Sequence, residues 1–271
     1  MNICLSNDDG IRAPGILAMF DALCTANYNV TTIAPLTVQS ATGHGITFHQ
    51  PLITTPVTVP TPAGRSLKGT AVDGRPADCV KLAMSELWPS MFGAKSRPDL
   101  LVSGMNAGAN CGINVIYSGT VAAALEGAFL GVPSIAVSLM LNKGQPNFAL
   151  GARWGLETIQ KLLADGLPDR HEVLSINIPP TDSPSLAPDA PLPPIVVCPM
   201  NTHGLIDAYD KRRNPIGEDY YWAAGHGLSF HATEQGSDVE ALLRGCITVT
   251  PLKFDLTDHT KLSKWEARLK A

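Results

Sequence analysis

"LSNDDGIRAPG", residues 5–15, places two adjacent aspartates, Asp8 and Asp9, directly after the short apolar run "NICLS". An apolar run of this length that is followed by polar residues and glycine is typical of a buried strand. Pro14 then begins a stretch with apolar residues at helical spacing, and proline is favoured in a first turn, where an N–H group has no partner in the helix. The segment therefore predicts a strand, a tight turn that carries two carboxylates, and a helix.

The same alternation of short apolar runs and helical patterns continues along the chain, which is typical of βαβ units around a mainly parallel sheet. The predicted strands cover residues 2–6, 30–35, 99–104, 134–139, 173–179 and 246–252. The predicted helices begin at Pro14, near Val80 and near Ser118, and cover about 149–163 and 239–243. We therefore expect an α/β fold, a mainly parallel sheet with flanking helices.

The helix that starts near Ser118 is the most regular of these patterns. Its apolar residues at helical spacing should face the core, and they are Val121, Leu125, Ala128 and Phe129. Gly131 and Pro133 then end the helix, because neither residue favours its continuation.

Three segments depart from this alternation. Residues 36–69 are rich in turns and then in threonine and proline, which predicts a β excursion. The run "PPTDSPSLAPDAPLPP", 179–194, can hold neither a helix interior nor a sheet ladder, which predicts a surface loop. About 200–260 is less regular, and its aromatic residues around Tyr220 to Phe230 predict hairpins that serve oligomerisation. We expect residues 1–271 to form a single α/β domain with this β-hairpin-rich C-terminal extension.

The 271 residues carry a formal net charge of −4 at pH 7. Such a chain offers no electrostatic reason to bind a nucleic-acid polymer or an anionic membrane. The six cysteines are dispersed without a CxxC pair, which favours reduced thiols over a zinc site or disulfides. The N-terminal residues lack the pattern of a signal peptide, and no apolar stretch reaches about 18 residues. We therefore expect a cytoplasmic protein that acts on a small molecule.

Polar residues follow three of the predicted strands, at the edge of the sheet where ligands bind in open α/β folds. Asp8 and Asp9 repel each other unless one is protonated or a cation lies between them. Ser40 and Asn106 could add a hydroxyl and an amide oxygen, and such oxygen donors favour Mg²⁺, Mn²⁺ or Ca²⁺ over Zn²⁺. The alternative is that the two aspartates only cap the following turn and helix.

The glycine-rich run "SGMNAGANCGINVIYSGTVAAALEG", 103–127, leads into the helix at Ser118. Free N–H groups at Gly119 and Thr120 would face outward there and could bind a phosphate. The alternative is an ordinary serine cap. A cation site and an anion site at adjoining strand ends together indicate a phosphate ester that lies between them.

The chain also resembles a known family, the stationary-phase survival protein SurE family of metal-dependent 5′/3′-nucleotidases. The motifs that carry the resemblance are "LSNDDGIRAPGI", "GRPADCV", "SGMNAGANCGINVIYSGTVAAALEG", "GVPSIAVSL", "SINIP" and "ITVTPLKFDLTDH". The resemblance runs from residue 2 to about 260. It implies a Rossmann-like core, one divalent metal per chain and hydrolysis of nucleoside monophosphates.

Residue by residue, the resemblance implies a metal site and a phosphate site. The residues that match the family's metal ligands are Asp8, Asp9, Ser40 and Asn106. Those that match its substrate-phosphate segment are Ser118, Gly119 and Thr120, with Asn106 beside them. One departure concerns the loop after the second strand, because Ala41 follows Ser40 where the family usually has glycine. This departure bears on the shape of the nucleoside pocket.

Two mechanisms are compatible with such a site, with Asp8 and Asp9 as the catalytic residues. Either a metal-activated water attacks phosphorus, or Asp8 itself attacks and forms an aspartyl phosphate. We favour the water mechanism because no DxD pattern and no supporting lysine follow the first strand. A non-catalytic module that binds metal and nucleotide is a further alternative. His44 is either a solvated loop residue or a substrate contact, and the expected assembly is a homodimer or homotetramer.

Overall fold

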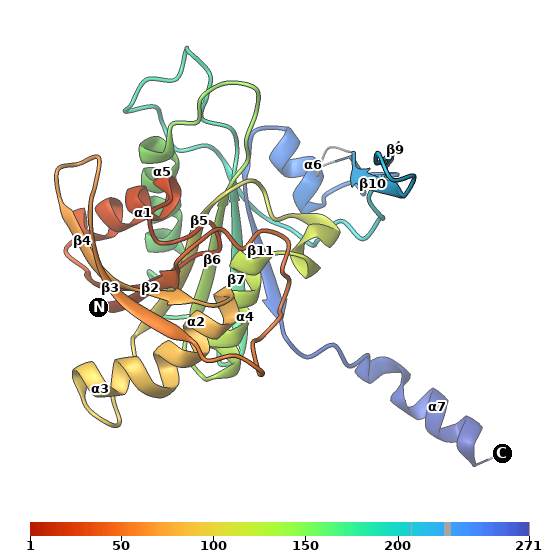
Figure 1. Cartoon of the computed structure of the whole chain (residues 1–271), viewed down its shortest axis with the longest axis horizontal. Coiled ribbons are helices and arrows are strands. Elements are labelled where there is room, and N and C mark those ends of the chain that lie inside the picture. The colour runs from red at the N-terminus through yellow and green to blue at the C-terminus, as the bar shows by residue number, and fades with distance from the viewer. Residues whose placement is uncertain (207, 225–228, 271) are drawn as a thin grey trace.

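The computed structural model describes residues 1–206, 208–224 and 229–270, and its core is a nine-stranded sheet (Figure 1). The strand order is β3-β4-β2-β1-β5-β6-β7-β11-β8. The strands are β1 (Asn2–Ser6), β2 (Asn29–Pro35), β3 (Ile53–Pro60), β4 (Ser66–Asp73), β5 (Leu100–Ala107), β6 (Ser134–Leu139), β7 (Glu172–Ile178), β8 (Ile195–Val197) and β11 (Ile247–Lys253). The strands from β4 to β7 in this order are parallel, whereas β3 and β11 are antiparallel to β4 and β7.

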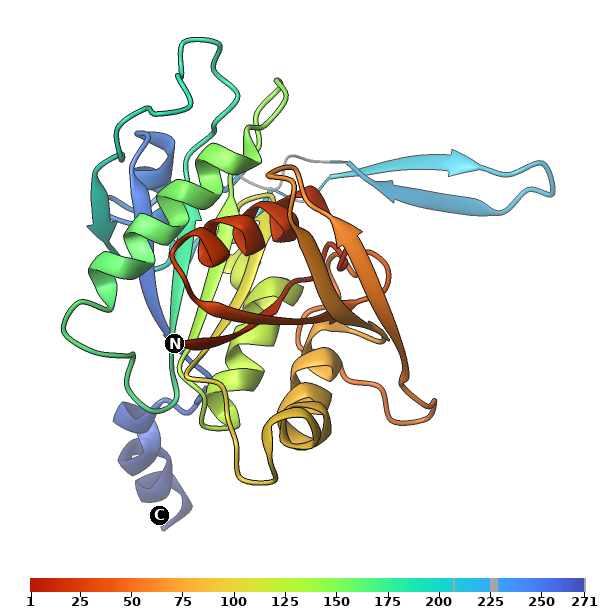
Figure 2. The ribbon, with the colours of Figure 1, turned by 90° about the vertical axis from the view of Figure 1, so that its left-hand side faces the viewer.

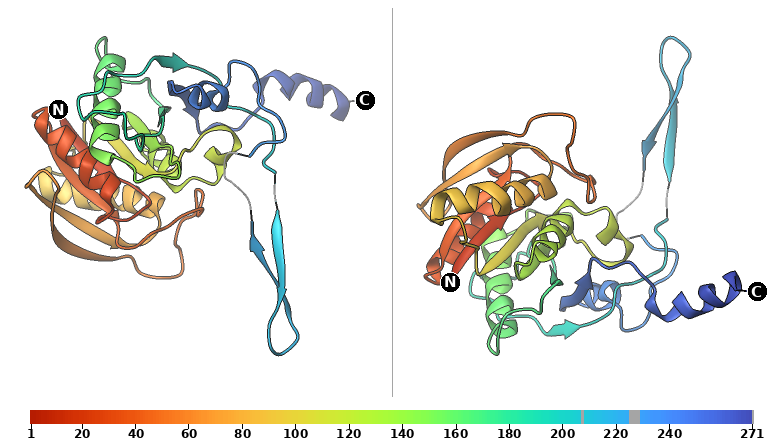
Figure 3. Two further views of the ribbon diagram at one scale, coloured as in Figure 1. Left: turned by 90° about the horizontal axis from the view of Figure 1, so that it is seen from above. Right: turned by 90° about the horizontal axis from the view of Figure 1, so that it is seen from below.

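Helices cover both faces of the sheet (Figure 3). Helix α1 (Pro14–Thr25) packs against α5 (Phe148–Leu162), and α2 (Pro76–Leu82) packs against α4 (Gly119–Phe129). Alternate residues of β1 point to opposite faces of the sheet. Ile3 and Leu5 lie on the face covered by α1 and α5, and Cys4 lies on the face covered by α2. This double burial explains why the central strands β1, β5 and β6 are buried along nearly their whole length.

The parallel register places the candidate residues at one edge of the sheet. Ser6 at the end of β1 lies beside Ser103 of β5. The segment that follows β1 therefore emerges beside the carboxyl-terminal part of β5, which contains Asn106. Gly10 has a φ of +96°, which a residue with a side chain rarely adopts, and it turns the chain toward α1. The close approach of the two strand ends is thus a property of sheet pairing.

Most of the predicted elements are confirmed, including the β excursion, the loop at 179–194 and the cap at Ser118. The helix predicted near Val80 runs through α2, a π-helical turn η1 (Ala83–Leu87) and α3 (Trp88–Phe92). The prediction that Phe129 faces the core is wrong, because its side chain is 52% exposed and packs edge-on against Phe254. Eight residues after Val121, the helix has turned the side chain roughly 80° away from the buried line.

Two arms project from the sheet (Figure 2). The first is a hairpin of β9 (Tyr209–Arg213) and β10 (Asp219–Ala223), all of whose residues are exposed. The second is the C-terminal helix α7 (Leu262–Leu269), preceded by the short turn η3 (His259–Lys261). The predicted hairpin is therefore confirmed over β9 and β10, while 225–228 lie outside the described residues. Within the described part of the chain, no helix is long and apolar enough to cross a membrane.

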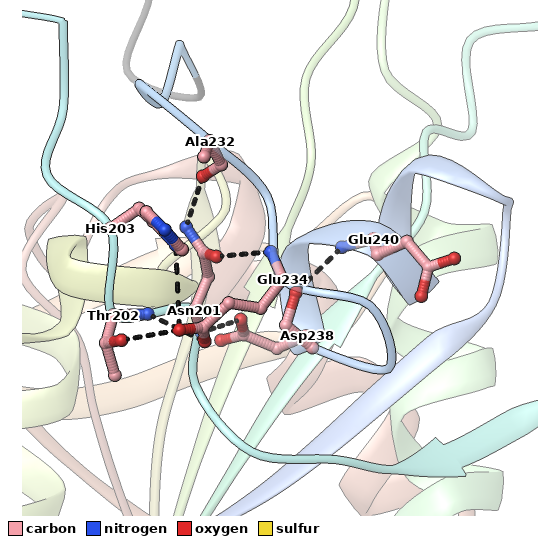
Figure 4. Close-up of polar contacts among 8 residues, drawn as sticks. Asn201, Thr202, His203, Ala232, Glu234, Asp238 and Glu240 are labelled. Atoms are coloured by element: carbon pink, nitrogen blue, oxygen red, sulfur yellow. Dashed lines mark hydrogen bonds and ion pairs between the residues drawn. The ribbon is translucent and has the colours of Figure 1, made fainter.

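The stem of the hairpin is fixed by a polar cluster around Asn201 and Glu234 (Figure 4). The Asn201 amide group donates to the Ala232 carbonyl and accepts from the Glu234 N–H. The Glu234 carboxylate accepts from the hydroxyl and N–H of Thr202. At the start of α6 (Asp238–Leu243), Asp238 accepts from the Asn201 N–H. The chain segments that enter and leave the hairpin are therefore held together at its base.

Candidate active site

Asp8 is the most deeply placed of the candidate residues, with a relative exposure of 6%. Its Oδ1 accepts a hydrogen bond of 2.5 Å from the Thr120 hydroxyl, and its carbonyl accepts from the Gln39 N–H at 2.8 Å. The pKa of Asp8 is raised to about 6, mainly by burial and also by the neighbouring Asp9, against the lowering effect of the Thr120 hydroxyl. A buried carboxylate beside a second one is stabilised by a cation, because the cation favours the charged form.

Asp9 and Asn106 extend the oxygen donor set. Asp9 is partly buried, and its Oδ2 accepts a 2.8 Å hydrogen bond from the Ala107 N–H. Burial is also the main reason that the pKa of Asp9 is raised. The Nδ2 of Asn106 donates to the Gly108 carbonyl at 2.8 Å. This bond uses the nitrogen side of the amide and leaves Oδ1 as the atom that can bind a cation.

The start of α4 lies against Asp8. Ser118 caps the helix, since its side chain accepts from the Val121 N–H at 3.0 Å. A Cβ atom added at Gly119 would lie 2.8 Å from Cβ of Asp8 and 2.9 Å from Cγ of Pro76. Only glycine therefore lets the helix approach the first strand this closely. Thr120 is fully buried, and its hydroxyl is used by Asp8.

Ser40 belongs to a segment without helix or strand, residues 36–52, which hydrogen bonds to several elements hold in place. Two backbone hydrogen bonds hold the segment: the Gly43 N–H donates to the Tyr117 carbonyl at 3.0 Å, and the Gln39 N–H donates to the Asp8 carbonyl. Two side chains of the segment also bind buried carboxylates. His44 Nε2 lies 2.8 Å from Oε2 of Glu126, and the Thr47 hydroxyl donates to Asp78 at 2.7 Å.

Glu126 of α4 is shared between two basic side chains. Its Oε1 accepts from Nζ of Lys81 at 3.1 Å, opposite the contact with His44. Burial alone would raise the pKa of Glu126, but the hydrogen bonds from His44 and Lys81 hold the pKa below its ordinary value. His44, which the sequence left open between solvent and substrate, is thus in contact with the helix that starts at the candidate site.

A cavity of about 630 Å³ brings the candidate residues together. Its lining includes Asp8, Asp9, Ser40, Asn106 and Ser118, which come from the ends of three strands and from the start of α4. Gly119 and Thr120 do not line it. Among the described lining residues none is Lys or Arg. The negative charge of a bound phosphate would therefore be balanced by a cation on the aspartates and by the helix N-terminus.

The donor set is suited to a hard divalent cation. It consists of two carboxylates, a hydroxyl and an amide oxygen, and these are the ligands that Mg²⁺, Mn²⁺ and Ca²⁺ prefer. No cluster of three or more His, Cys, Asp or Glu side chains that could hold a metal occurs among the described residues, as is consistent with a mixed oxygen set.

Sequence reasoning did not assign a role to the neutral residues that line the cavity, among them Asn110, Asn114, Tyr117, Met140 and Leu141. The first three lie within the glycine-rich run 103–127, whereas Met140 and Leu141 belong to no motif and come close through the pairing of β5 with β6. Tyr117 could have been noticed from its place beside Ser118, whereas Met140 and Leu141 look like the ordinary end of a strand.

Comparison with known proteins identifies the family. Residues 3–201 match the family model described as "Survival protein SurE". The chain is 41% identical to the 5′-nucleotidase SurE of Heliobacterium modesticaldum, with 98% of this chain and 92% of the relative covered. It is 38% identical to that of a Nostoc species, with 98% of each chain covered. The crystal structure of the SurE protein from Aquifex aeolicus aligns over 100% of both chains with a TM-score of 0.79 and 32% identity. The chain therefore belongs to the survival protein SurE family.

Proposed function

We propose that this protein is a divalent-metal-dependent phosphatase that hydrolyses nucleoside 5′-monophosphates, and also 3′-monophosphates, to nucleoside and phosphate. The observation that carries the proposal is the meeting of Asp8, Asp9 and the start of α4 in one cavity. A cation site beside a helix N-terminus is suited to a phosphate ester. Relatives of the chain that carry the name 5′-nucleotidase support the nucleotide substrate.

The proposed metal ligands are Asp8, Asp9, Ser40 and Asn106, which bind one cation per chain. Mg²⁺ or Mn²⁺ suits these ligands, and Ca²⁺ is the alternative. When bound, the cation stabilises negative charge on the phosphoryl oxygens and lowers the pKa of a coordinated water. The 36–52 segment keeps Ser40 at this site through its contacts with Glu126 and Asp78.

The chain's own groups then divide the reaction between them. Asp9 is the more exposed carboxylate and orients the attacking water, whereas Asp8 is held in place by Thr120. The start of α4 is assigned to the phosphoryl oxygens, and Ser118, which caps the helix, is the residue there that lines the cavity. Gly119 and Thr120 do not line the cavity, and they support the site by holding the start of the helix against Asp8.

Direct attack by Asp8, which would form an aspartyl phosphate, is the second candidate mechanism. We favour water because one carboxylate oxygen of Asp8 already accepts from Thr120 and the residue is almost fully buried. A non-catalytic module is less well supported, since relatives that match nearly the whole chain carry the name of an enzyme, 5′-nucleotidase.

The test is phosphate release from AMP by the purified protein. Mg²⁺ or Mn²⁺ should support turnover, and EDTA should abolish it until the metal is restored. Hydroxylamine quenching during turnover should trap no aspartyl phosphate. Activity that is unchanged in EDTA would refute the metal dependence, and a trapped adduct would favour attack by Asp8.

We further propose that the chain acts as one α/β unit that assembles into a homodimer or homotetramer in the cytoplasm. The assembly is supported by the exposed hairpin and by α7, which exposes the apolar side chains Leu262, Trp265 and Leu269. The cytoplasmic location is supported by six cysteines that are all free. A single monomeric species in sedimentation velocity at micromolar concentration would refute the assembly.

A further inference from the structure

Asp238, at the start of α6, is a buried carboxylate that the proposed reaction does not use. Its side chain is 1% exposed. Among the described residues no Lys, Arg or His forms an ion pair with it. Burial raises the pKa of Asp238, and hydrogen bonds from backbone N–H groups oppose this rise. Burying a carboxylate costs free energy unless it is hydrogen-bonded, so the role of Asp238 lies in the groups that it binds.

The two carboxylate oxygens of Asp238 bind N–H groups from distant parts of the chain. Oδ2 accepts from the Gly112 N–H at 2.7 Å. Oδ1 accepts from the Asn201 N–H at 2.8 Å (Figure 4) and also from the adjacent Val239 N–H. Gly112 begins the short turn η2 (Gly112–Ile116), whereas Asn201 lies at the base of the hairpin. One carboxylate therefore connects the hairpin base to a segment that leads into the candidate site.

This segment, residues 110–118, supplies much of the lining of the cavity. The residues that it contributes are Asn110, Asn114, Tyr117 and Ser118. Within the segment, the Tyr117 N–H donates to the Asn114 carbonyl at 3.0 Å. Because this bond closes the end of η2, the turn forms a short link between Gly112 and Ser118, the cap of α4. A displacement of Gly112 would therefore be passed on to Ser118.

Gly112 is tightly enclosed where it meets Asp238. Its φ is +57°, and a Cβ atom added there would lie 2.9 Å from two ring atoms of Phe230 and 3.2 Å from the Asn201 carbonyl oxygen. The preceding residue, Cys111, is fully buried in an apolar cluster with two residues of α6. Apolar packing has no preferred direction, whereas a hydrogen bond does. The bond to Asp238 is therefore the contact that orients the start of η2.

We propose that Asp238 is a positioning residue for phosphate-ester hydrolysis: by binding the Gly112 N–H it fixes η2, and thereby Ser118 at the start of α4. This inference rests on the proposed function, which assigns the start of α4 to the phosphoryl oxygens. Asp238 does not line the cavity, and its hydrogen bonds reach none of the proposed metal ligands. The use of substrate should therefore depend on Asp238, whereas the binding of the cation should not.

The alternative is a purely local role at the start of α6, where a negative charge stabilises a helix. Ser237 already caps this helix, since its side chain accepts from the Glu240 N–H at 3.4 Å. Two of the bonds of Asp238 reach residues 126 and 37 positions away instead. Ser237 is thus a matched control: it is adjacent, fully buried and supports the same helix start, but it does not bind Gly112.

The kinetic test compares Asp238→Asn with Ser237→Ala. Asparagine has the shape of aspartate, but its NH₂ group cannot accept the bond that Gly112 or Asn201 donates. For Asp238→Asn we expect kcat/KM for AMP to fall on the order of tenfold, because a small misplacement of a substrate contact is costly. The Mn²⁺ concentration for half-maximal activity should stay within about twofold of the wild type, since the metal ligands share no bond with Asp238. Ser237→Ala should leave both quantities unchanged.

Hydrogen exchange, measured by mass spectrometry, adds a readout that does not require activity. In Asp238→Asn, amides of residues 110–118 should exchange on the order of tenfold faster, because an anchoring hydrogen bond is lost. Ser237→Ala should accelerate exchange only in α6. If the wild type hydrolyses no phosphate ester but this difference is found, the proposed function fails and the anchoring by Asp238 stands. Unchanged kcat/KM and exchange in Asp238→Asn, or the same losses in Ser237→Ala, would overturn the positioning role.

Gly112→Ala tests the same link from its other end, and it replaces Asp238→Asn if that variant does not fold. The added Cβ would meet the Phe230 ring, so Gly112 must move while Asp238 keeps its carboxylate. We expect a loss of kcat/KM for AMP of the same order, with an unchanged requirement for Mn²⁺. Wild-type kcat/KM in Gly112→Ala, or a loss that is matched by a higher requirement for Mn²⁺, would overturn the proposal.

Discussion

The strand-end site and the two arms are built on opposite principles. At the site, the buried Asp8 accepts from the Thr120 hydroxyl through its side chain and from the Gln39 N–H through its carbonyl, and the partly buried Asp9 accepts from the Ala107 N–H. In strands β9 and β10 and in α7, every residue is exposed. The comparison teaches that one chain suffices to position the candidate site residues, whereas the arms expose surface that one chain cannot cover.

The largest effect should follow from removing a charge at the site. Asp8→Asn or Asp9→Asn should lower kcat on the order of 10³-fold, because both carboxylates are proposed ligands of the cation and Asp9 also orients the attacking water. The fold should remain, since asparagine has the same shape as aspartate. Phosphate release measures the loss, and circular dichroism is the control for folding. Near-normal turnover in both variants would exclude a catalytic role for the pair.

A smaller loss is expected when the partner of Asp8 is changed. Thr120→Ala removes the hydroxyl that donates to Asp8, and such supporting bonds contribute about 10- to 100-fold to metal affinity or activity. Thr120→Ser keeps the hydroxyl and should retain most activity. Metal titration of both variants by calorimetry checks the result. If Thr120→Ser is as impaired as Thr120→Ala, the methyl group and not the hydroxyl is what the site requires.

The segment that carries Ser40 gives a third, weaker prediction. His44→Ala removes its contact with Glu126, and the metal concentration for half-maximal activity should rise about tenfold, with kcat at saturating metal unchanged. Lys81→Met is the matched control, since it removes the other contact of Glu126 without touching the segment. An equal shift in Lys81→Met would mean that the charge of Glu126 matters and not the contact with the loop.

The pKa of Glu126 leads to a prediction on stability. Because its pKa in the folded protein is lowered, ionised Glu126 stabilises the fold above its unfolded pKa, and this contribution is lost as pH falls through the folded value. In Glu126→Gln, the unfolding free energy should therefore decrease less than in the wild type when the pH is lowered. Urea unfolding between about pH 3 and pH 7 measures this difference. Parallel curves for wild type and variant would contradict it.

The arms should give the smallest effect on the chain itself. Replacing Leu262 and Trp265 of α7 with serine should change the unfolding free energy of the separated chain by less than about 0.5 kcal/mol, since both side chains are exposed. The same change should shift the assembly toward monomers. Sedimentation velocity and urea unfolding measure the two effects. A marked loss of chain stability without a change in the mass of the assembly would show that α7 supports the fold and not the contact between copies.

Much of the fold could be predicted because its strands are short apolar runs and its helices have clear caps, such as Ser118. The expected meeting of Asp8 with Asn106 also followed from topology, since parallel strands end at one edge. The contact between Thr120 and Asp8 could not be predicted, because 112 positions separate the two residues. Phe129 was misplaced for a different reason, because a position eight residues after Val121 lies roughly 80° from the buried line of the helix.

The contact between His44 and Glu126 was equally hidden from the sequence. A histidine in a segment rich in turns is usually solvated, and a glutamate in a helix is usually exposed. Here the helix is buried along this side, with Glu126 only 5% exposed, so that the carboxylate needs a partner. The partner, His44, belongs to a loop whose path depends on several contacts at once. A local sequence pattern does not predict such a path.

The edges of the main sheet have a consequence for solubility and for the way in which copies can meet. At one edge, β3 contains Pro56 and Pro60, which lack the N–H group that another strand would need. At the other edge, β8 spans three residues and offers little backbone to pair. Both features are known devices against edge-to-edge aggregation. The sheet is thereby kept from polymerising through its own hydrogen bonds, and the proposed assembly would use the projecting hairpin and helix instead.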